Sequence, residues 1–208
     1  MRIGPVGAWI VRVAMPGVVA FGAAVAALPA AGASPLADIG PAPSLALIDA
    51  TGKPFDLARL RGKAVLVSFV YTTCGGTCPA TTYTLTRVRR ALEQGGLWGK
   101  EVEFVSVTLD PARDKPEVLA AYARTYEADP ATWHFLTGPP DAVARAIADW
   151  DMWVRPGPGG ALDHPSRIFL LDPRGHQREI YSLEFLRPAD VARDIASVLG
   201  EASEDRPR

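Results

Sequence analysis

Two short apolar runs, each followed by a helical pattern, most constrain the fold of this chain. Residues Ala64–Val70 and Val102–Thr108 are rich in apolar and β-branched side chains, and each run is too short to be a helix of its own. Such runs are typical of strands buried on both faces, as in a parallel sheet covered by helices. Strand and helix patterns alternate along the rest of the chain, and residues 45–57 have the pattern of a short hairpin. The sequence therefore predicts an α/β sheet with helices on both faces and an N-terminal hairpin.

The first 33 residues differ from the rest of the chain. Arg2 and Arg12 precede an uncharged stretch rich in alanine and valine, which ends in Ala-Gly-Ala at 31–33. This is the pattern of an export signal, and an uncleaved membrane anchor is the alternative, because no charged residue occurs between Arg12 and Asp38. Either interpretation puts the folded part outside the cytoplasm. We expect a leader, a linker, a globular domain and a disordered polar tail, at residues 1–33, 34–42, 43–200 and 201–208.

Net charge limits the partners that the folded part can have. Removing the leader removes two arginines and no acidic residue, which leaves 20 lysines and arginines against 23 aspartates and glutamates. A mildly acidic chain without a basic stripe is a poor partner for nucleic acid. We therefore expect no nucleic acid among its ligands.

Both cysteines of the chain, Cys74 and Cys78, lie in the loop after the first apolar run, and Pro79 fits the first turn of the helix that follows. A cysteine at a helix N-terminus has its thiolate favoured by the helix dipole, which makes it a better nucleophile and metal ligand. Three interpretations remain open: a structural disulfide, a thiol–disulfide enzyme, or a metal site. A disulfide across so small a loop would stabilise the fold little. The spacing is one residue longer than the C-x-x-C of known redox pairs.

Two thiolates are an incomplete metal shell, and the chain has three histidines from which a third ligand can come. His176 follows a turn glycine, where an exposed side chain is the default. His134 alternates with apolar neighbours on a short strand and has the pattern of a surface or half-buried residue. His164 follows a Gly/Pro-rich loop and precedes a predicted strand at 166–171, so it is the candidate ligand, although a lone histidine is more often structural.

Four motifs occur in the order seen in the Sco/SenC family of copper metallochaperones, which this chain resembles from about residue 43 to residue 199. They are FVYTTCGGTCP at 69–79, VSVTLDPARD at 105–114, WHFLTG at 133–138, and Asp163-His164 followed by LDPRG at 171–175. The resemblance implies a monomeric, thioredoxin-like protein of the periplasm or the outer face of the inner membrane. It would bind copper and deliver it to the dinuclear copper site of cytochrome c oxidase, or mature the thiols of that site.

The resemblance implies Cys74, Cys78 and His164 as the copper ligands, and the family can also hold the two cysteines as a disulfide. Two soft thiolates and one imidazole suit Cu(I), whereas a closed zinc site would want a fourth protein ligand. The alternative function is that of an extracytoplasmic thiol–disulfide oxidoreductase, in which one cysteine attacks a partner disulfide and the other resolves it. A thiol peroxidase is the weakest alternative, because no further polar residues that would activate a peroxide are identified.

The chain departs from the family pattern at two places near these ligands. Many members have Pro-Asp between the cysteines, where this chain has Gly75-Gly76-Thr77, and many follow the histidine with Ser or Thr, where this chain has Pro165. We expect Pro165 to be cis, as is the proline that faces the cysteine loop in thioredoxin-like folds. Asp163 is a candidate to orient the imidazole.

Two aspartates after the second apolar run have the pattern of structural residues. Asp110 and Asp114 are expected to form a turn and to cap the next helix, since Glu117 follows Asp114 by three residues. Near the C-terminus we expect a final helix at 188–199.

Overall fold

A computed structural model describes residues 36–204 of the chain, so the predicted leader at 1–33 and residues 205–208 lie outside the described residues. The strands are β1 (Gly40–Pro41), β2 (Ala46–Asp49), β3 (Pro54–Asp56), β4 (Ala64–Val70), β5 (Val102–Thr108), β6 (Trp133–Thr137), β7 (Arg155–Pro156), β8 (Leu162–Asp163), β9 (Ile168–Leu171) and β10 (His176–Tyr181). The α-helices are α1 (Thr77–Gln94), α2 (Pro116–Thr125), α3 (Pro140–Asp149) and α4 (Pro188–Glu204). Within the described residues, none of the helices has the length and apolar character needed to cross a membrane.

The main sheet is mixed and has the strand order β1-β10-β9-β4-β5-β6-β2-β3. Strands β4, β5 and β6 are parallel, and the strands that flank them pair antiparallel. Every residue of β4 and of β5 is buried. The prediction that these two runs are strands buried on both faces is therefore confirmed.

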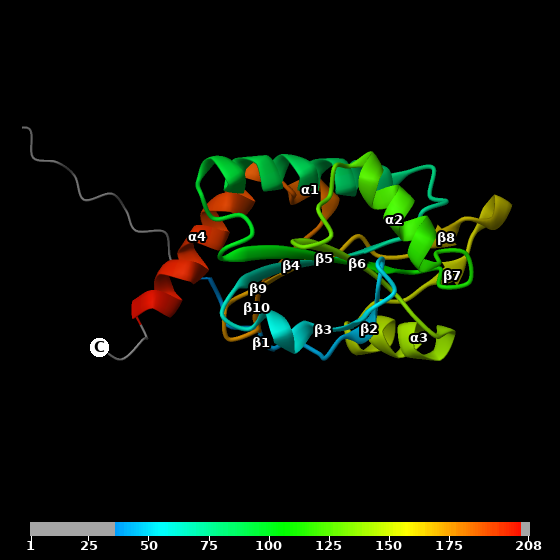
Figure 1. Ribbon diagram of the computed structural model, residues 1–208, viewed down its shortest axis with the longest axis horizontal. Coiled ribbons are helices and arrows are strands. Elements are labelled where there is room, and N and C mark those ends of the chain that lie inside the picture. The colour runs from blue at the N-terminus through cyan, green and yellow to red at the C-terminus, as the bar shows by residue number, and fades with distance from the viewer. Residues whose placement is uncertain (1–35, 205–208) are drawn as a thin grey trace, which may run out of the picture. The chain divides into compact units, whose positions relative to one another are not determined.

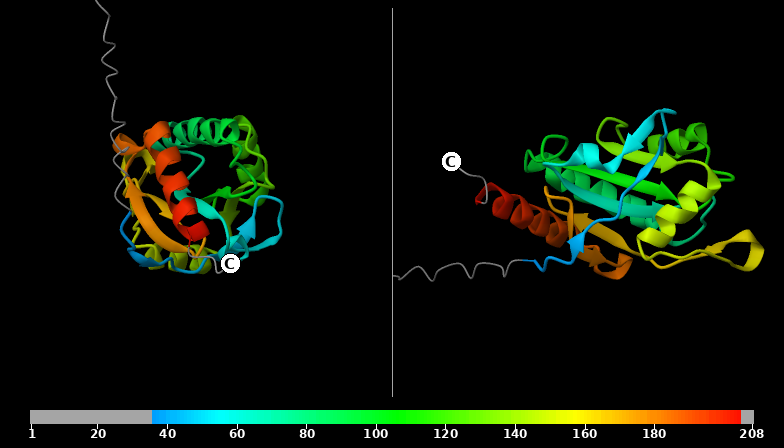
Figure 2. Two further views of the ribbon diagram at one scale, coloured as in Figure 1. Left: turned by 90° about the vertical axis from the view of Figure 1, so that its left-hand side faces the viewer. Right: turned by 90° about the horizontal axis from the view of Figure 1, so that it is seen from below.

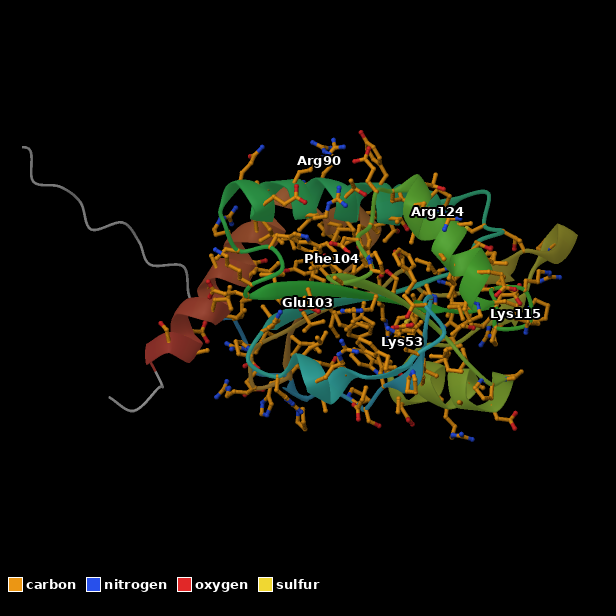
Figure 3. The ribbon with its side chains drawn as sticks, in the orientation of Figure 1. Lys53, Arg90, Glu103, Phe104, Lys115 and Arg124 are labelled. Atoms are coloured by element: carbon orange, nitrogen blue, oxygen red, sulfur yellow. The ribbon has the colours of Figure 1, made fainter. Side chains whose placement is uncertain are left out.

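Helices cover both faces of this sheet (Figures 1 and 2). Helices α1, α2 and α4 lie on one face, while α3 lies on the other. Because successive residues of a strand point to opposite faces, Glu103 and Phe104 of β5 lie on opposite sides of the sheet (Figure 3). The predicted α/β architecture, covered on both faces, is confirmed.

The N-terminal hairpin is also confirmed, and its turn is held by one buried carboxylate. The Oδ1 atom of Asp49, at the end of β2, accepts hydrogen bonds from the backbone N–H groups of Thr51 and Lys53. Gly52 completes the turn with a φ of 82°, a value that glycine adopts at no steric cost. The segment predicted as a linker, 34–42, contributes to the sheet, since β1 pairs with β10.

The C-terminal helix is longer than the sequence pattern predicts. Helix α4 continues through residues 201–204, which the sequence assigns to a disordered tail. Glu201 accepts a hydrogen bond at 2.6 Å from Arg178, whose guanidinium is buried beside Asp172. This tertiary ion pair stabilises the last turns of the helix, and local sequence does not reveal it.

Topology brings two distant loops to one edge of the sheet. The loop that follows β4 lies at the carboxyl edge of the parallel strands, where α/β sheets commonly bind ligands. Because β9 runs antiparallel to β4, its amino end lies at the same edge. The β7–β8 hairpin precedes β9 and extends beyond this end of the sheet (Figure 1). The two cysteines and His164 are therefore carried to one place.

Candidate metal centre

The two cysteines differ in exposure. Cys78 lies in the first turn of α1 and is only 2% exposed, whereas Cys74 lies in the preceding loop and is half-buried. The backbone N–H of Cys74 donates to the carbonyl of Tyr71 at 3.3 Å, so residues 71–74 form a turn. Both are free thiols. Any disulfide between them therefore belongs to another state of the protein.

His164 contacts the buried cysteine. Its Nε2 atom lies 3.7 Å from the Sγ atom of Cys78, although the two residues are 86 positions apart in the chain. Its Nδ1 atom lies 3.0 Å from the carbonyl oxygen of Pro165. Since a carbonyl only accepts, Nδ1 carries a proton, and Nε2 is the ring atom that faces the sulfur. A neutral imidazole in this tautomer is a metal ligand through Nε2.

The surroundings shift the pKa values of the two thiols in opposite directions. Burial raises the pKa of Cys78 to about 12, and the nearby Cys74 and Asp114 add to that effect. Burial also opposes ionisation of Cys74, but hydrogen bonds from the backbone N–H groups of Cys78 and Gly76 and from the Cys78 thiol outweigh it. The pKa of Cys74 is therefore below its usual value. In the absence of metal, Cys74 is the thiol that ionises first.

The donor set is chemically suited to copper, but it is not closed. Among the described residues, no group of three His, Cys, Asp or Glu side chains lies close enough together to hold a metal ion. The structure pairs His164 with Cys78, and Cys74 belongs to the adjoining loop. The two glycines of that loop lie in open space, since a Cβ atom at either would have no neighbour within 4 Å. Completion of a three-ligand shell therefore requires the His164 ring and the Cys74 thiol, which already interacts with the Cys78 thiol, to move closer together.

Tyr71 joins the cysteine loop to the segment that carries the histidine. Its hydroxyl donates to the carbonyl of Leu162 at 3.3 Å and accepts from the N–H of the same residue at 3.2 Å. The Tyr71 ring packs edge-on against the His164 ring, with 5.9 Å between centroids. The sequence analysis did not single out Tyr71. The available signal was its place directly after a strand buried on both faces.

Asp114 is a buried carboxylate below the cysteine loop, and its prediction as a helix cap is wrong. Helix α2 has Lys115 at its N-cap and no capping side chain. Asp114 is 0% exposed and accepts hydrogen bonds from Thr72 and Thr108, which follow β4 and end β5. These tertiary donors replace the local capping box that the spacing to Glu117 suggested.

Two further expectations for the residues around the histidine are wrong. The expected role of Asp163 in orienting the imidazole is filled by the Pro165 carbonyl, and the Asp163 side chain is exposed on β8. No peptide bond in the described residues is cis, so Pro165 is trans. The physical reason is that β9 begins only at Ile168, so residue 165 is not at the start of the strand. The side chain that faces the cysteine loop is that of His164.

The other two histidines lie away from this centre. His134 is 3% exposed, so the prediction of a surface or half-buried residue is wrong. Its Nε2 atom lies 2.7 Å from the carboxylate of Glu103 on the neighbouring strand, which also pairs with Lys63. His176 lies at the start of β10, and its Nδ1 atom is 2.9 Å from the Asp38 carboxylate. The sequence-based preference for His164 as the ligand candidate is consistent with these positions.

A protein-family model and a related protein both match most of this chain. The SCO1/SenC family model matches residues 40–200. The SCO1 protein homolog of Bacillus subtilis is 28% identical over 150 residues, which cover 70% of this chain and 76% of that protein.

Solved structures agree in fold. A SCO1/SenC family lipoprotein from Bacillus anthracis superposes with a TM-score of 0.70 at 26% identity, covering 76% of this chain and 95% of that one. ScoI of Bradyrhizobium japonicum with copper bound superposes with a TM-score of 0.64 at 27% identity, covering 75% of this chain and 98% of that one. Since the family model covers most of the chain and the fold agrees, the chain belongs to the SCO1/SenC family.

Proposed function

We propose that this protein is an extracytoplasmic copper metallochaperone that binds Cu(I) through Cys74, Cys78 and His164. The observation that supports it is the 3.7 Å approach of the His164 Nε2 atom to the Cys78 sulfur, with the Nδ1 atom held at the Pro165 carbonyl. Soft thiolates with one imidazole favour Cu(I) over harder divalent ions. The related ScoI of Bradyrhizobium japonicum has been solved with copper bound.

The acceptor that we propose is the copper-bearing subunit of cytochrome c oxidase. A metallochaperone has to release its cargo, and a shell with only three protein ligands leaves room for a ligand from the acceptor to enter. Copper then transfers by stepwise ligand exchange, with no change in its charge. The half-buried position of Cys74 makes it the first of the two sulfurs that a docked acceptor reaches.

The leader pattern supports a location outside the cytoplasm. Residues 1–33 have the pattern of an export signal or anchor, and the Bacillus anthracis relative is a lipoprotein. Mass spectrometry of the mature protein tests this location: we expect a chain that starts near Ser34 and is recovered from the periplasm. An intact Met1 on a cytoplasmic protein would contradict it.

The ligand set is tested by substitution of the histidine. We expect His164→Ala to weaken Cu(I) binding by more than about 10-fold, as measured by competition with a chromophoric Cu(I) chelator. His176→Ala is the matched control, because His176 pairs with Asp38 away from the cysteines, and it is expected to leave the affinity unchanged. Equal affinities for the two variants would exclude His164 as a ligand.

The lowered pKa of Cys74 and the raised pKa of Cys78 favour a second candidate function, that of a thiol–disulfide oxidoreductase. The Cys74 thiolate would attack a partner disulfide, form a mixed disulfide and release one partner thiolate. Cys78, after losing its proton, would then displace the second partner thiol and leave a Cys74–Cys78 disulfide. The partner gains two electrons and the protein loses two. Under this function, His164→Ala retains most of the reductase activity, whereas Cys74→Ser abolishes it.

A further inference from the structure

A buried carboxylate anchors the turn that carries Cys74. Asp114 is fully buried, and its Oδ1 atom accepts from the Thr72 hydroxyl at 2.5 Å. Its Oδ2 atom accepts from the Thr72 backbone N–H at 3.1 Å and from the Thr108 hydroxyl at 2.6 Å. Burial of a carboxylate is costly unless hydrogen bonds compensate it, so these donors hold the carboxylate in one orientation.

The anchor is itself held rigidly to the end of the sheet. The Thr108 hydroxyl also accepts from the backbone N–H of Asp110, and the N–H of Asp114 donates to the Asp110 carbonyl at 2.8 Å. Asp110, not Asp114, is the carboxylate that pairs with Arg113. The hydrogen bonds of the Asp114 carboxylate therefore go to Thr72 and Thr108, while the direct ion pair of Arg113 is with Asp110.

The other restraints on the Cys74 loop are local ones, since the thiol of Cys74 accepts from the N–H groups of Gly76 and Cys78 within the same loop and helix start. Thr72 is the second residue after β4, and the turn from Tyr71 to Cys74 is closed by one backbone hydrogen bond of 3.3 Å. Gly75 and Gly76 have no side chains, and a Cβ atom at either position would have no neighbouring atom within 4 Å. A loop of this kind loses much conformational entropy when a metal orders it, unless its start is already fixed.

We propose that Asp114 is a positioning residue for the copper site, acting through Thr72 to fix the turn that presents Cys74. The inference rests on the proposed copper binding and deepens it. The carboxylate does not contact the metal. It lowers the entropy lost on binding by holding the start of the loop in place before copper arrives.

The hydroxyl of Thr72 gives the sharpest test. Thr72→Val keeps the shape of the side chain and removes the donor, whereas Thr72→Ser keeps the donor. We expect Thr72→Val to weaken Cu(I) binding by about 10- to 100-fold, the usual cost of losing a residue that orients a ligand, and Thr72→Ser to stay near the wild type. Asp114→Asn replaces one acceptor oxygen by an amide NH2 and is expected to weaken binding no more than Thr72→Val, because the lost charge also removes one cause of the raised pKa of Cys78.

The double variant separates positioning from general damage. If Asp114 acts through Thr72, Thr72→Val combined with Asp114→Asn costs no more Cu(I) affinity than either single change. Asp172→Asn is the matched control, because Asp172 is a buried carboxylate that pairs with Arg174 and Arg178 at the other edge of the sheet. It is expected to lower thermal stability without changing Cu(I) affinity. Unchanged affinity in Thr72→Val, or additive losses in the double variant, would overturn the proposal.

A readout without copper keeps the proposal distinct from the proposed function. In the copper-free protein, hydrogen exchange of the amides at 72–76 is expected to rise at least about 10-fold in Thr72→Val and to stay unchanged in Thr72→Ser. If the wild-type protein bound no Cu(I), the proposed function would be wrong, and this exchange measurement would still test the anchor. Equal exchange in the two variants would refute the anchoring role. If Asp114→Asn does not fold, the two Thr72 variants decide alone.

Discussion

The Tyr71 hydroxyl hydrogen-bonds the start of the cysteine loop to the backbone that precedes His164. It is buried and makes two hydrogen bonds to one residue, Leu162, as donor and as acceptor. We predict that Tyr71→Phe lowers the free energy of unfolding in urea by about 0.5–1.5 kcal/mol, because these bonds are lost without a change in ring packing. Tyr83→Phe is the control: Tyr83 is 60% exposed on α1, and its loss of a hydroxyl is expected to change stability by less than about 0.5 kcal/mol. Equal effects would show that the bridge to Leu162 contributes nothing.

At the scale of elements, the β7–β8 hairpin is the least stable part of the site. Its strands pair at only two positions, Arg155 with Asp163 and Pro156 with Leu162, and two-stranded ribbons are marginal in water. We predict that amides at 155–161 exchange at least about 100-fold faster than those of β4 and β5, whose residues are all buried. Because His164 follows this hairpin, Cu(I) loading is expected to slow its exchange. Protection equal to that of β5 in the metal-free protein would contradict this prediction.

Local pattern predicted the elements well, and contacts between distant residues account for what it missed. The runs at β4 and β5 were recognised because burial on both faces demands continuous apolar residues. The approach of His164 to Cys78 depends on the antiparallel placement of β9, which spacing alone does not encode; the family resemblance supplied the ligand set. Asp114 fits a local capping pattern, but the hydroxyls of Thr72 in the cysteine loop and of Thr108 at the end of β5 donate to its carboxylate.

For the whole molecule, buried carboxylates make stability dependent on pH. Burial opposes ionisation of Glu103 of β5, but His134 and Lys63 hydrogen-bond to its carboxylate and hold its pKa below the ordinary 4.5. Burial likewise opposes ionisation of Asp172, and the His176 backbone N–H and Arg174 outweigh it, so its pKa lies below 3.8. A depressed pKa in the folded state gives stability that is present above the unfolded value and is lost as pH falls through the folded value.

The consequence is a protein that is most sensitive to acid. We predict that the free energy of unfolding in urea starts to fall below about pH 5 and that each such carboxyl contributes a slope of up to about 1.4 kcal/mol per pH unit between its two pKa values. Glu103→Gln removes one titrating group while leaving Lys63 and His134 in place. The free energy of unfolding of this variant is therefore expected to fall less steeply with decreasing pH than that of the wild type. Glu117→Gln is the control, because Glu117 lies in the first turn of α2 with none of these partners, and it should follow the wild-type curve. If the stability of the wild type were unchanged between pH 6 and pH 3, the folded and unfolded pKa values of these groups would have to be equal, and the contacts of Glu103 with Lys63 and His134 would stabilise nothing.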